Sequence, residues 1–240
     1  MVKILKAIDK NESYDIDKGL LPNLSFRMIL NARSGQGKTN FILNLLCRKE
    51  LYKNDFDEIF LFSPSINNDY KLRVLCDECD IDDSHIFNDY DEEELGVVLD
   101  HITEQYEEAL ANNEKPKHTL IILDDLMSKL KSNGQNNNIQ DAFIRGRHIG
   151  LSIIITTQFF SKVLPSCRAN CNCLVAFSCS DKQLEAIADE HCYMDRKKFK
   201  KMFRDATNKN NHDFFIVNYS NKPEERYLNK DFEVIDTSKY

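Results

Sequence analysis

The sequence predicts an α/β fold in which helices flank a mostly parallel central sheet. Apolar segments of strand length alternate with segments of helical periodicity along the 240 residues, as they do in parallel sheets covered by helices. A glycine-containing loop also stands between the first predicted strand and a helix. We expect one domain over 1–240, with a core at about 20–180 and C-terminal helices, a β-hairpin and a tail in 181–240.

Five segments rich in β-branched, leucine or aromatic residues are the predicted strands of the sheet. They are 26–30, 58–62, 119–123, 151–156 and 173–177. A terminal hairpin is expected to pair 213–218 with 226–228 across a turn at 221–223. The remaining residues, 229–240, should form a tail or a covering segment.

Helices are predicted from periodicity and from the residues that begin them. One follows the glycine-containing loop at 41–52. Apolar residues at three- and four-residue spacing mark a second helix over 95–110, and its acidic start at 91–94 suits a helix N-terminus. Ser180 and Gln183 form a candidate capping box ahead of a helix that follows the fifth strand.

The composition limits where the protein works and what it binds. A formal net charge of −7 argues against a monomer coated in basic surface for nucleic acid, but leaves open DNA contact through loops gathered in a ring. No apolar run reaches the roughly 18 residues that span a bilayer, and the N-terminus lacks a secretory signal. We expect a soluble, intracellular protein that is not secreted and has no membrane partner.

The eight cysteines suit an intracellular chain if they are reduced thiols. Two groups of them could bind zinc together with a histidine, but the second group lacks CxxC spacing. We therefore favour small buried hydrophobic side chains as their role. The residues concerned are Cys76, Cys79, Cys167, Cys171, Cys173, His85 and His191.

Residues 32–39 match a phosphate-binding loop, in the strand, loop and helix context that this motif requires. Successive N–H groups from Gly35 to Lys38 can converge on a phosphate, and the helix adds its positive N-terminal end. Lys38 supplies a charge for the β and γ phosphates, and the Thr39 hydroxyl can ligate Mg²⁺. ATP is thus the expected ligand of this region, and Mg²⁺ is expected at Thr39. The nucleotide-binding residues are Ala32, Arg33, Ser34, Gly35, Gln36, Gly37, Lys38, Thr39 and Asn40.

The first position of this loop departs from the motif, because Ala32 stands where glycine is usual. Alanine is tolerable there if the residue keeps a negative φ. The two positions that most need a free φ remain glycine, so the assignment as a phosphate loop holds.

Two aspartates follow the predicted strand 119–123. A carboxylate at the end of a buried strand next to the strand of the phosphate loop can hold Mg²⁺, usually through water, and we assign this role to Asp124. Asp125 can polarise the attacking water as general base. Alternatively the pair caps the next helix, although the phosphate loop itself predicts acids here.

A glutamine and a group of arginines flank the predicted strand 151–156. Gln158 could report the nucleotide state or orient water, or it could be an ordinary polar residue at a strand end. In a ring, Arg145 or Arg147 could reach a neighbour's γ-phosphate and raise the rate by about 10³ to 10⁵. The alternative is a solvated or carboxylate-paired arginine.

Four segments together resemble the FtsK/HerA superfamily, in particular the poxvirus-type genome-packaging ATPases of DNA viruses and their satellite or transposon-like relatives. The resemblance covers about residues 20–180. Kinases and GTPases do not share this order of Gly-Arg, strand, Thr-Gln, Pro and R-x-N. The segments are LPNLSFRMILNARSGQGKT, LIILDD, GRHIGLSIIITTQ and SKVLPSCRANCNCLVAFSCS.

The resemblance implies a RecA-like fold of the ASCE class and a homo-oligomeric ring, a pentamer or hexamer. It implies ATP-driven translocation of double-stranded DNA into a preformed capsid, with capsid proteins as partners. The expected location is the host cytoplasm or viral factory, or the virion.

The resemblance also implies roles for single residues. Lys38 and Thr39 match the nucleotide and Mg²⁺ residues of the family, and Gln158 matches its strand-end sensor. Asp124 and Asp125 match its acidic pair, although many relatives carry glutamate at the second position. The trans-acting arginine falls on Arg147, with Arg145 and Arg168 as competitors.

Contact with DNA and two other functions are left open by the sequence. Lys129 and Lys131 could project into a ring's pore, and the basic stretch 196–204 could hold phosphates or be a solvated helix face. A P-loop kinase for a nucleoside or small molecule should carry an arginine-rich substrate or lid segment. A nucleotide-gated assembly or segregation factor would bind DNA without moving it.

Overall fold

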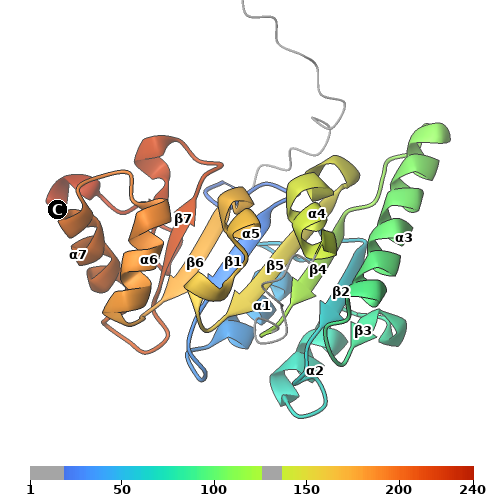
Figure 1. Ribbon diagram of the computed structural model, residues 1–240, viewed down its shortest axis with the longest axis horizontal. Coiled ribbons are helices and arrows are strands. Elements are labelled where there is room, and N and C mark those ends of the chain that lie inside the picture. The colour runs from blue at the N-terminus through green and yellow to red at the C-terminus, as the bar shows by residue number, and fades with distance from the viewer. Residues whose placement is uncertain (1–18, 126–136) are drawn as a thin grey trace, which may run out of the picture.

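An eight-stranded sheet forms the centre of the computed structural model, which describes residues 19–125 and 137–240 (Figure 1). In spatial order the strands are β3 (Ile86–Phe87), β2 (Glu58–Phe62), β4 (Thr119–Leu123), β5 (Leu151–Thr157), β1 (Arg27–Asn31), β6 (Cys173–Phe177), β7 (Phe214–Asn218) and β8 (Tyr227–Leu228). Neighbouring strands are parallel from β3 to β6, whereas the pairs β6–β7 and β7–β8 are antiparallel. The predicted α/β fold, with a mostly parallel sheet, is confirmed.

The five predicted strands all form, with ends that agree to within one residue. Strand order differs in one respect, because β5 lies between β1 and the acidic strand β4. The expectation that the acidic strand lies next to the strand of the phosphate loop is therefore wrong. The composition of a single strand does not encode its neighbours, which depend on how the crossover helices pack.

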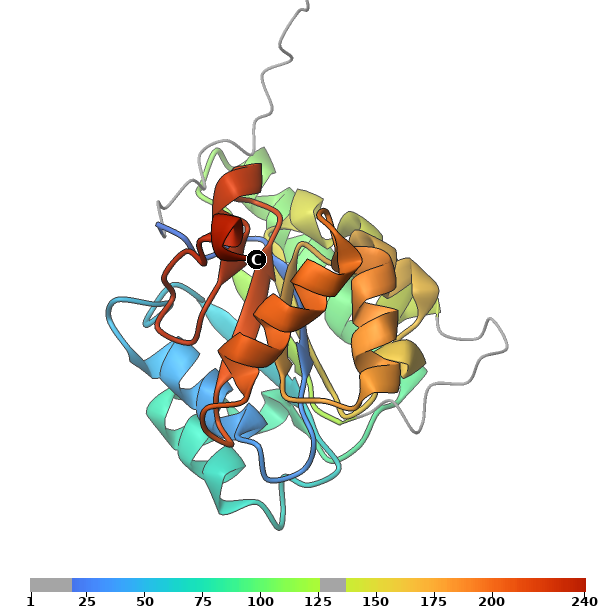
Figure 2. The ribbon, with the colours of Figure 1, turned by 90° about the vertical axis from the view of Figure 1, so that its left-hand side faces the viewer.

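Helices cover both faces of the sheet (Figures 1 and 2). One face carries α1 (Lys38–Cys47) and α2 (Tyr70–Glu78). The other carries α3 (Glu92–Ala111), α4 (Asn137–Arg145), α5 (Pro165–Asn170), α6 (Asp181–His191) and α7 (Arg196–Thr207). The sequence patterns did not reveal α2 or the two-residue strand β3, which is too short to show a period.

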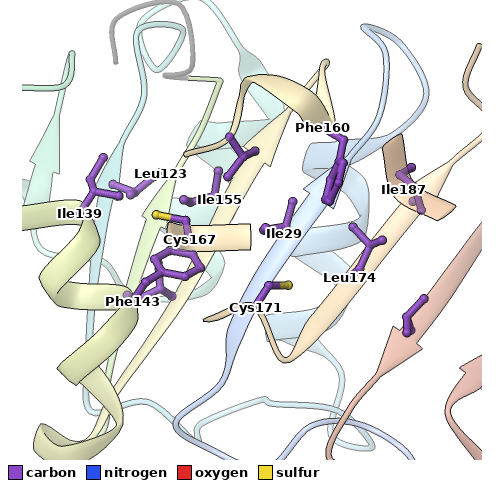
Figure 3. Close-up of a cluster of buried hydrophobic side chains, with 14 of the residues drawn as sticks. Ile29, Leu123, Ile139, Phe143, Ile155, Phe160, Cys167, Cys171, Leu174 and Ile187 are labelled. Carbon is purple, nitrogen blue, oxygen red and sulfur yellow. The ribbon is translucent and has the colours of Figure 1, made fainter. Parts of the chain in front are cut away.

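Alternate residues of each central strand supply the two cores. On β1, Met28 and Leu30 pack towards α1, and Ile29 packs towards the helices of the opposite face. Successive side chains of a strand point to opposite faces, so a fully buried strand must be apolar throughout. Figure 3 shows the second core, where Phe143 of α4 and Cys167 of α5 meet the sheet.

Two predicted helix starts have different outcomes. Asp91 caps α3 by accepting from the N–H groups of Glu93 and Glu94, as the acidic start indicates. α6 begins directly after Ser180, but the capping box does not form. Gln183 instead donates to the Gln158 carbonyl at 3.0 Å and accepts from a backbone N–H in the loop after β5. The buried amide thus satisfies that loop rather than the start of its own helix.

Only part of the predicted apolar stripe of α3 faces the core. Leu95, Val98 and Ile102 are buried, whereas Leu110 is 48% exposed. In Figure 1 the last turns of α3 extend past the edge of the sheet. They therefore leave the core with which the periodic stripe was expected to pack.

The predicted C-terminal hairpin is confirmed, and it continues the central sheet because β7 pairs with β6. Asn218 and Asn221, at the turn, both donate to the Leu20 carbonyl. The segment that follows folds back on the hairpin through a bridge between Leu228 and Val234. Residues expected to form a tail or cover thus pack beside the sheet.

The two cysteine groups lie on different elements. Cys76 belongs to the core under α1 and α2, whereas Cys167 and Cys171 belong to the core of the opposite face. Burial raises the pKa of the Cys167 and Cys171 thiols to about 12, which keeps them protonated near neutral pH. Within 19–125 and 137–240, no group of three or more His, Cys, Asp or Glu could hold a metal ion.

A helix that crosses a bilayer needs roughly 20 predominantly apolar residues in succession. Across the part of the chain that the structure describes, no helix has both the length and the apolar composition needed to cross a membrane.

Candidate functional site

The phosphate loop leaves the carboxyl end of β1 and leads into α1. Gly35 has φ 78° and Gly37 has φ 108°, values that L-residues rarely adopt. Ala32 lies outside the left-handed region, and its N–H donates to the Thr157 carbonyl at 2.9 Å. The condition set by the sequence for alanine at this position is therefore met.

Gln36 holds the loop in its folded form. Its side-chain oxygen accepts from the Arg33 N–H at 2.6 Å, and its amide donates to the Ser178 carbonyl at 2.9 Å. The Gln36 carbonyl in turn lies 2.8 Å from Nδ1 of His212, which places the ring proton on Nδ1. The loop is thus tied to the end of β6 and to the turn before β7.

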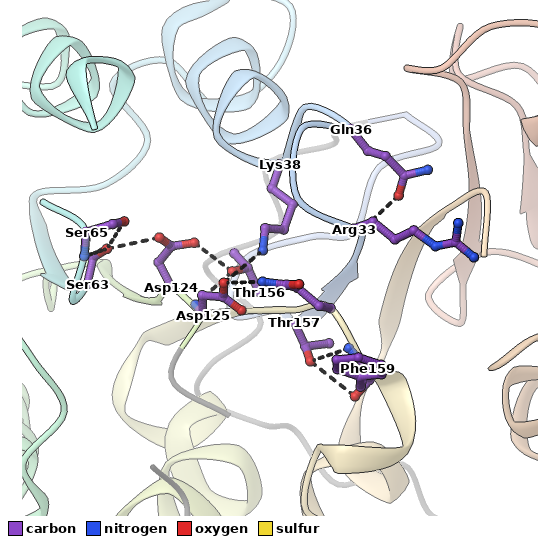
Figure 4. Close-up of polar contacts among 11 residues, drawn as sticks. Arg33, Gln36, Lys38, Ser63, Ser65, Asp124, Asp125, Thr156, Thr157 and Phe159 are labelled. Carbon is purple, nitrogen blue, oxygen red and sulfur yellow. Dashed lines mark hydrogen bonds and ion pairs between the residues drawn. The ribbon is translucent and has the colours of Figure 1, made fainter. Parts of the chain in front are cut away.

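Asp124 is held at the carboxyl end of β4 with 5% of its surface exposed. One carboxylate oxygen accepts from the Thr156 hydroxyl at 2.6 Å, and the other accepts from the Ser63 hydroxyl at 3.0 Å (Figure 4). Two hydroxyl donors satisfy a buried carboxylate that would otherwise be costly. Ser63 and Thr156 lie at the ends of β2 and β5, so three strands fix this group.

Asp125 meets both the phosphate loop and the strand-end glutamine. Its Oδ2 accepts from the Gln158 amide at 2.7 Å and lies 3.5 Å from Nζ of Lys38. Its N–H donates to the Thr156 hydroxyl at 3.0 Å, and its φ is 51°, a conformation that aspartate tolerates better than most residues. The structure therefore brings together Lys38, Asp125 and Gln158.

These contacts bear on the alternative in which the aspartates cap the next helix. Both carboxylates interact with side chains of the site, which favours the functional interpretation. Lys129 and Lys131, the candidate pore residues, lie outside the described residues.

Sequence reasoning missed Ser63, Thr156 and His212. Ser63 directly follows an apolar strand, as the aspartates do, and the same signal could have found it. Thr156 lies one residue before the end of β5, so the sequence pattern does not distinguish it from the other residues of the strand. His212 is 176 residues from Gln36 along the chain, and no local pattern predicts such a contact.

The arginine expected to act in trans lies away from this site. Arg147 is exposed and precedes β5 in a short 3₁₀ helix, Gly146–Ile149. The seven residues of β5 separate it from Gln158 by about 23 Å at strand spacing. It therefore lies at the opposite edge of the sheet from the phosphate loop of its own chain.

The competing arginines differ in their surroundings. Arg145 is exposed at the last turn of α4. Nε of Arg168 lies 2.9 Å from Glu190, and its guanidinium donates to the Ser161 carbonyl at 3.1 Å. Arg168 is thus engaged within its own chain.

The basic stretch 196–204 forms α7, and part of its charge is neutralised by α6. Arg196, Lys200 and Arg204 pair with acidic side chains of that helix. The partners are Glu185, Asp189 and Asp181. This interhelical pairing favours the structural interpretation of the stretch over a phosphate-binding one.

Comparisons of the sequence with known proteins find relatives in poxviruses. The family model described as Poxvirus A32 protein matches residues 14–236. The chain is 32% identical over 168 residues to the DNA packaging protein OPG160 of vaccinia virus (strain Copenhagen), over 69% of this chain and 57% of that protein. The monkeypox virus protein of the same name is also 32% identical, and 52% of it is covered. The chain thus spans little more than half the length of these relatives.

Solved structures share the fold at low sequence identity. B204, the DNA-packaging ATPase from Sulfolobus turreted icosahedral virus, has a TM-score of 0.53 at 15% identity, over 80% of this chain and 92% of that chain. EssC (ATPases 2 and 3) from Geobacillus thermodenitrificans has a TM-score of 0.58 at 11% identity, over 89% of this chain and 40% of that one. Identities this low establish the common fold and leave the chemistry to the residues of the site.

Proposed function

The chain belongs to the poxvirus A32 protein family, and from this membership we propose that it is an ATP-hydrolysing motor that translocates double-stranded viral DNA into a preformed capsid. The observation that carries the proposal is the constellation of Lys38, Asp125 and Gln158 at one edge of the sheet. A phosphate loop that met no carboxylate would support nucleotide binding alone. The names of the viral relatives support the choice of DNA as the cargo.

The loop and the acidic strand supply complementary groups for a nucleotide. Main-chain N–H groups between Gly35 and Lys38 would hold the phosphates, with Lys38 at the β and γ positions. The Thr39 hydroxyl and the Asp124 carboxylate are hard oxygen donors that suit Mg²⁺. When bound, Mg²⁺ would neutralise charge that develops on the phosphates.

Hydrolysis would depend on Asp125 and Gln158. Asp125 would accept a proton from the attacking water, which is the role of a general base. The side-chain amide of Gln158 donates one hydrogen to Asp125. The second hydrogen of this amide and its side-chain oxygen can orient the water. A γ-phosphate would compete with Asp125 for Lys38, so nucleotide binding would release the carboxylate for this task.

Movement of DNA would require a ring of several copies, a pentamer or hexamer. With a net charge of −7, one subunit is poorly suited to hold DNA alone, but a few cations per subunit would multiply around a pore. Arg147, at the edge opposite the loop, could reach the site of a neighbouring subunit. Capsid proteins and the viral factory are the proposed partners and location.

The proposal is tested by measuring release of inorganic phosphate from ATP with and without double-stranded DNA. Wild-type protein should release phosphate faster when DNA is present, and Lys38→Ala should abolish release. Mass measurement in solution with an ATP analogue and DNA should show a ring. Processive movement should displace a third strand bound to the duplex ahead of the motor.

Each alternative gives a different result. Transfer of phosphate to a nucleoside, without free phosphate, would indicate a kinase. Turnover without strand displacement would indicate an assembly or segregation factor that binds DNA without moving along it. Normal turnover by Lys38→Ala would refute the site itself.

A further inference from the structure

A cavity of about 340 Å³ opens beside the phosphate loop, within the range of small-molecule sites. Four separate parts of the chain contribute to it, namely the loop with α1 and the residues just after that helix, the end of β6, the turn before β7 with β7 itself, and the segment after β8. The residues on which the argument depends are Asn44, Phe41, Phe214, Phe232, His212 and Lys230. None of its lining residues within the described ranges is acidic.

Aromatic rings form one wall of the cavity. The rings of Phe41 and Phe214 meet edge to face with centroids 5.0 Å apart, and Phe232 lies 6.1 Å from Phe214. Phe41 is buried, whereas Phe214 and Phe232 are partly exposed. Exposed aromatic surface beside a phosphate site is suited to stacking on a heterocyclic base.

Phe232 occupies its place in an unusual backbone conformation. Its φ is 60°, which is strained for a bulky residue. The side chain of Asn229 fixes the turn by accepting from the N–H groups of Asp231 and Glu233. The turn thus holds the aromatic ring of a segment beyond the sheet against the cavity.

Polar groups at the rim are suited to a nucleoside. Nζ of Lys230 lies 3.3 Å from the buried carboxylate of Asp213, which anchors this lysine at the cavity. The Asn44 amide donates to the Asn40 carbonyl at 2.7 Å, so its carbonyl oxygen can still accept a hydrogen bond from an exocyclic amino group. Among the residues that the structure describes, the cavity lining holds no carboxylate, which would accept from both N1–H and the 2-amino group of guanine.

His212 joins the cavity to the phosphate loop. It contacts the Gln36 carbonyl, and a Cβ atom placed on Gly37 would lie 3.3 Å from its Nδ1. The cavity and the loop therefore share a wall. A ligand with its phosphates on the loop could place its nucleoside in the cavity.

We propose that this cavity binds the base and ribose of an adenine nucleotide, and that the C-terminal segment carrying His212, Phe214 and Phe232 gives the site its selectivity for the base. The inference rests on the proposed function, because it assigns the nucleoside half of the same site. It gives the hairpin and the segment after it a role in substrate choice.

The test separates recognition of the base from recognition of the phosphates. Affinities for ATP, GTP, CTP and inorganic tripolyphosphate are measured with Mg²⁺ for wild type, Phe232→Ala, Phe232→Trp and the exposed-aromatic control Tyr70→Ala. Wild type should bind ATP more tightly than the other three. Phe232→Ala should weaken ATP binding by about tenfold, the effect of losing one stacking contact, and leave tripolyphosphate binding unchanged. Phe232→Trp should retain ATP affinity, and Tyr70→Ala should behave as wild type.

Two results would overturn the assignment. One is an affinity of the wild type for GTP, CTP or tripolyphosphate that equals its affinity for ATP, and the other is an unchanged ratio of ATP to tripolyphosphate affinity in Phe232→Ala. Tripolyphosphate binding that still depends on Lys38 would then leave the proposed function intact. If tripolyphosphate binding were absent or insensitive to Lys38→Ala, both proposals would fail.

Discussion

The Lys38 ammonium lies 3.5 Å from Oδ2 of Asp125, the same oxygen that accepts the Gln158 amide hydrogen. The phosphate loop and the proposed hydrolytic machinery are thus linked through one carboxylate oxygen. A triphosphate that attracts Lys38 would change the environment of the proposed base at the moment of binding. Nucleotide binding and activation of water would therefore be coupled by electrostatics rather than by a distant movement.

Asp125→Asn separates these two steps. Asparagine keeps the shape of the side chain but cannot take a proton from water, so the turnover number should fall by at least about 100-fold. ATP affinity should stay equal or increase, since the variant removes a negative charge near the phosphates. Phosphate release and nucleotide binding are the measurements, and exposed Asp100→Asn is the control. Turnover close to that of wild type would exclude Asp125 as the base.

Thr156 is expected to orient both aspartates, because its hydroxyl donates to Asp124 and accepts from the Asp125 N–H. The residue is fully buried. Thr156→Val should leave these groups unpaired, cost about 1–3 kcal/mol in the free energy of unfolding, and raise the Mg²⁺ concentration needed for turnover.

Thr156→Ser is the matched variant, because it retains the hydroxyl. Urea unfolding and a Mg²⁺ titration of turnover should place it near wild type. If the serine and valine variants behaved alike in both measurements, the hydroxyl would not be the group that matters.

The site shows which features a single sequence can supply. Asp124, Asp125 and Gln158 could be predicted because polar residues directly after apolar parallel strands lie at the edge that holds the phosphate loop. The position of β5 between β1 and β4 could not be predicted from the sequence, because strand order depends on tertiary packing. The His212 contact with Gln36 could not either, since it joins segments that are far apart along the chain and follow no shared period.

Acid should destabilise the protein through His191. Burial lowers the pKa of this imidazole to about 4, and the charge of Arg168 acts in the same direction. The unfolded chain, with a pKa near 6.5, therefore binds a proton that the folded chain excludes between pH 6.5 and 4. Stability is complete above this window and falls as the pH decreases through it, by up to about 3 kcal/mol.

Urea unfolding at several pH values measures this loss. Between pH 6.5 and 4, His191 contributes to the slope of the free energy of unfolding against pH. This contribution should disappear in His191→Gln and remain in the exposed control His148→Gln. The Tyr219 hydroxyl, 2.5 Å from Nδ1, can still find a partner in the glutamine side chain. An unchanged slope in His191→Gln would show that other groups cause the acid sensitivity.

Arg147 should act on the site of a neighbouring subunit. The length of β5 keeps Arg147 about 23 Å from Gln158 of its own chain. Each active interface would therefore combine Lys38 of one subunit with Arg147 of its neighbour. Arg147→Ala alone should reduce turnover by about 10³-fold or more. Mixed with inactive Lys38→Ala subunits, it should regain activity, because about a quarter of the interfaces in a random ring would combine an intact loop with an intact arginine.

The matched control for this experiment is a mixture of Lys38→Ala with Asp125→Asn. Both substitutions change the same site of a subunit, so no subunit of such a mixed ring has that site intact. This mixture should therefore stay inactive at every ratio, whereas the Arg147→Ala mixture should peak near equal amounts of the two variants. Rescue in both mixtures would point to exchange of whole sites between subunits. A fully active Arg147→Ala protein, or a mixture that regains nothing, would remove Arg147 from the catalytic cycle.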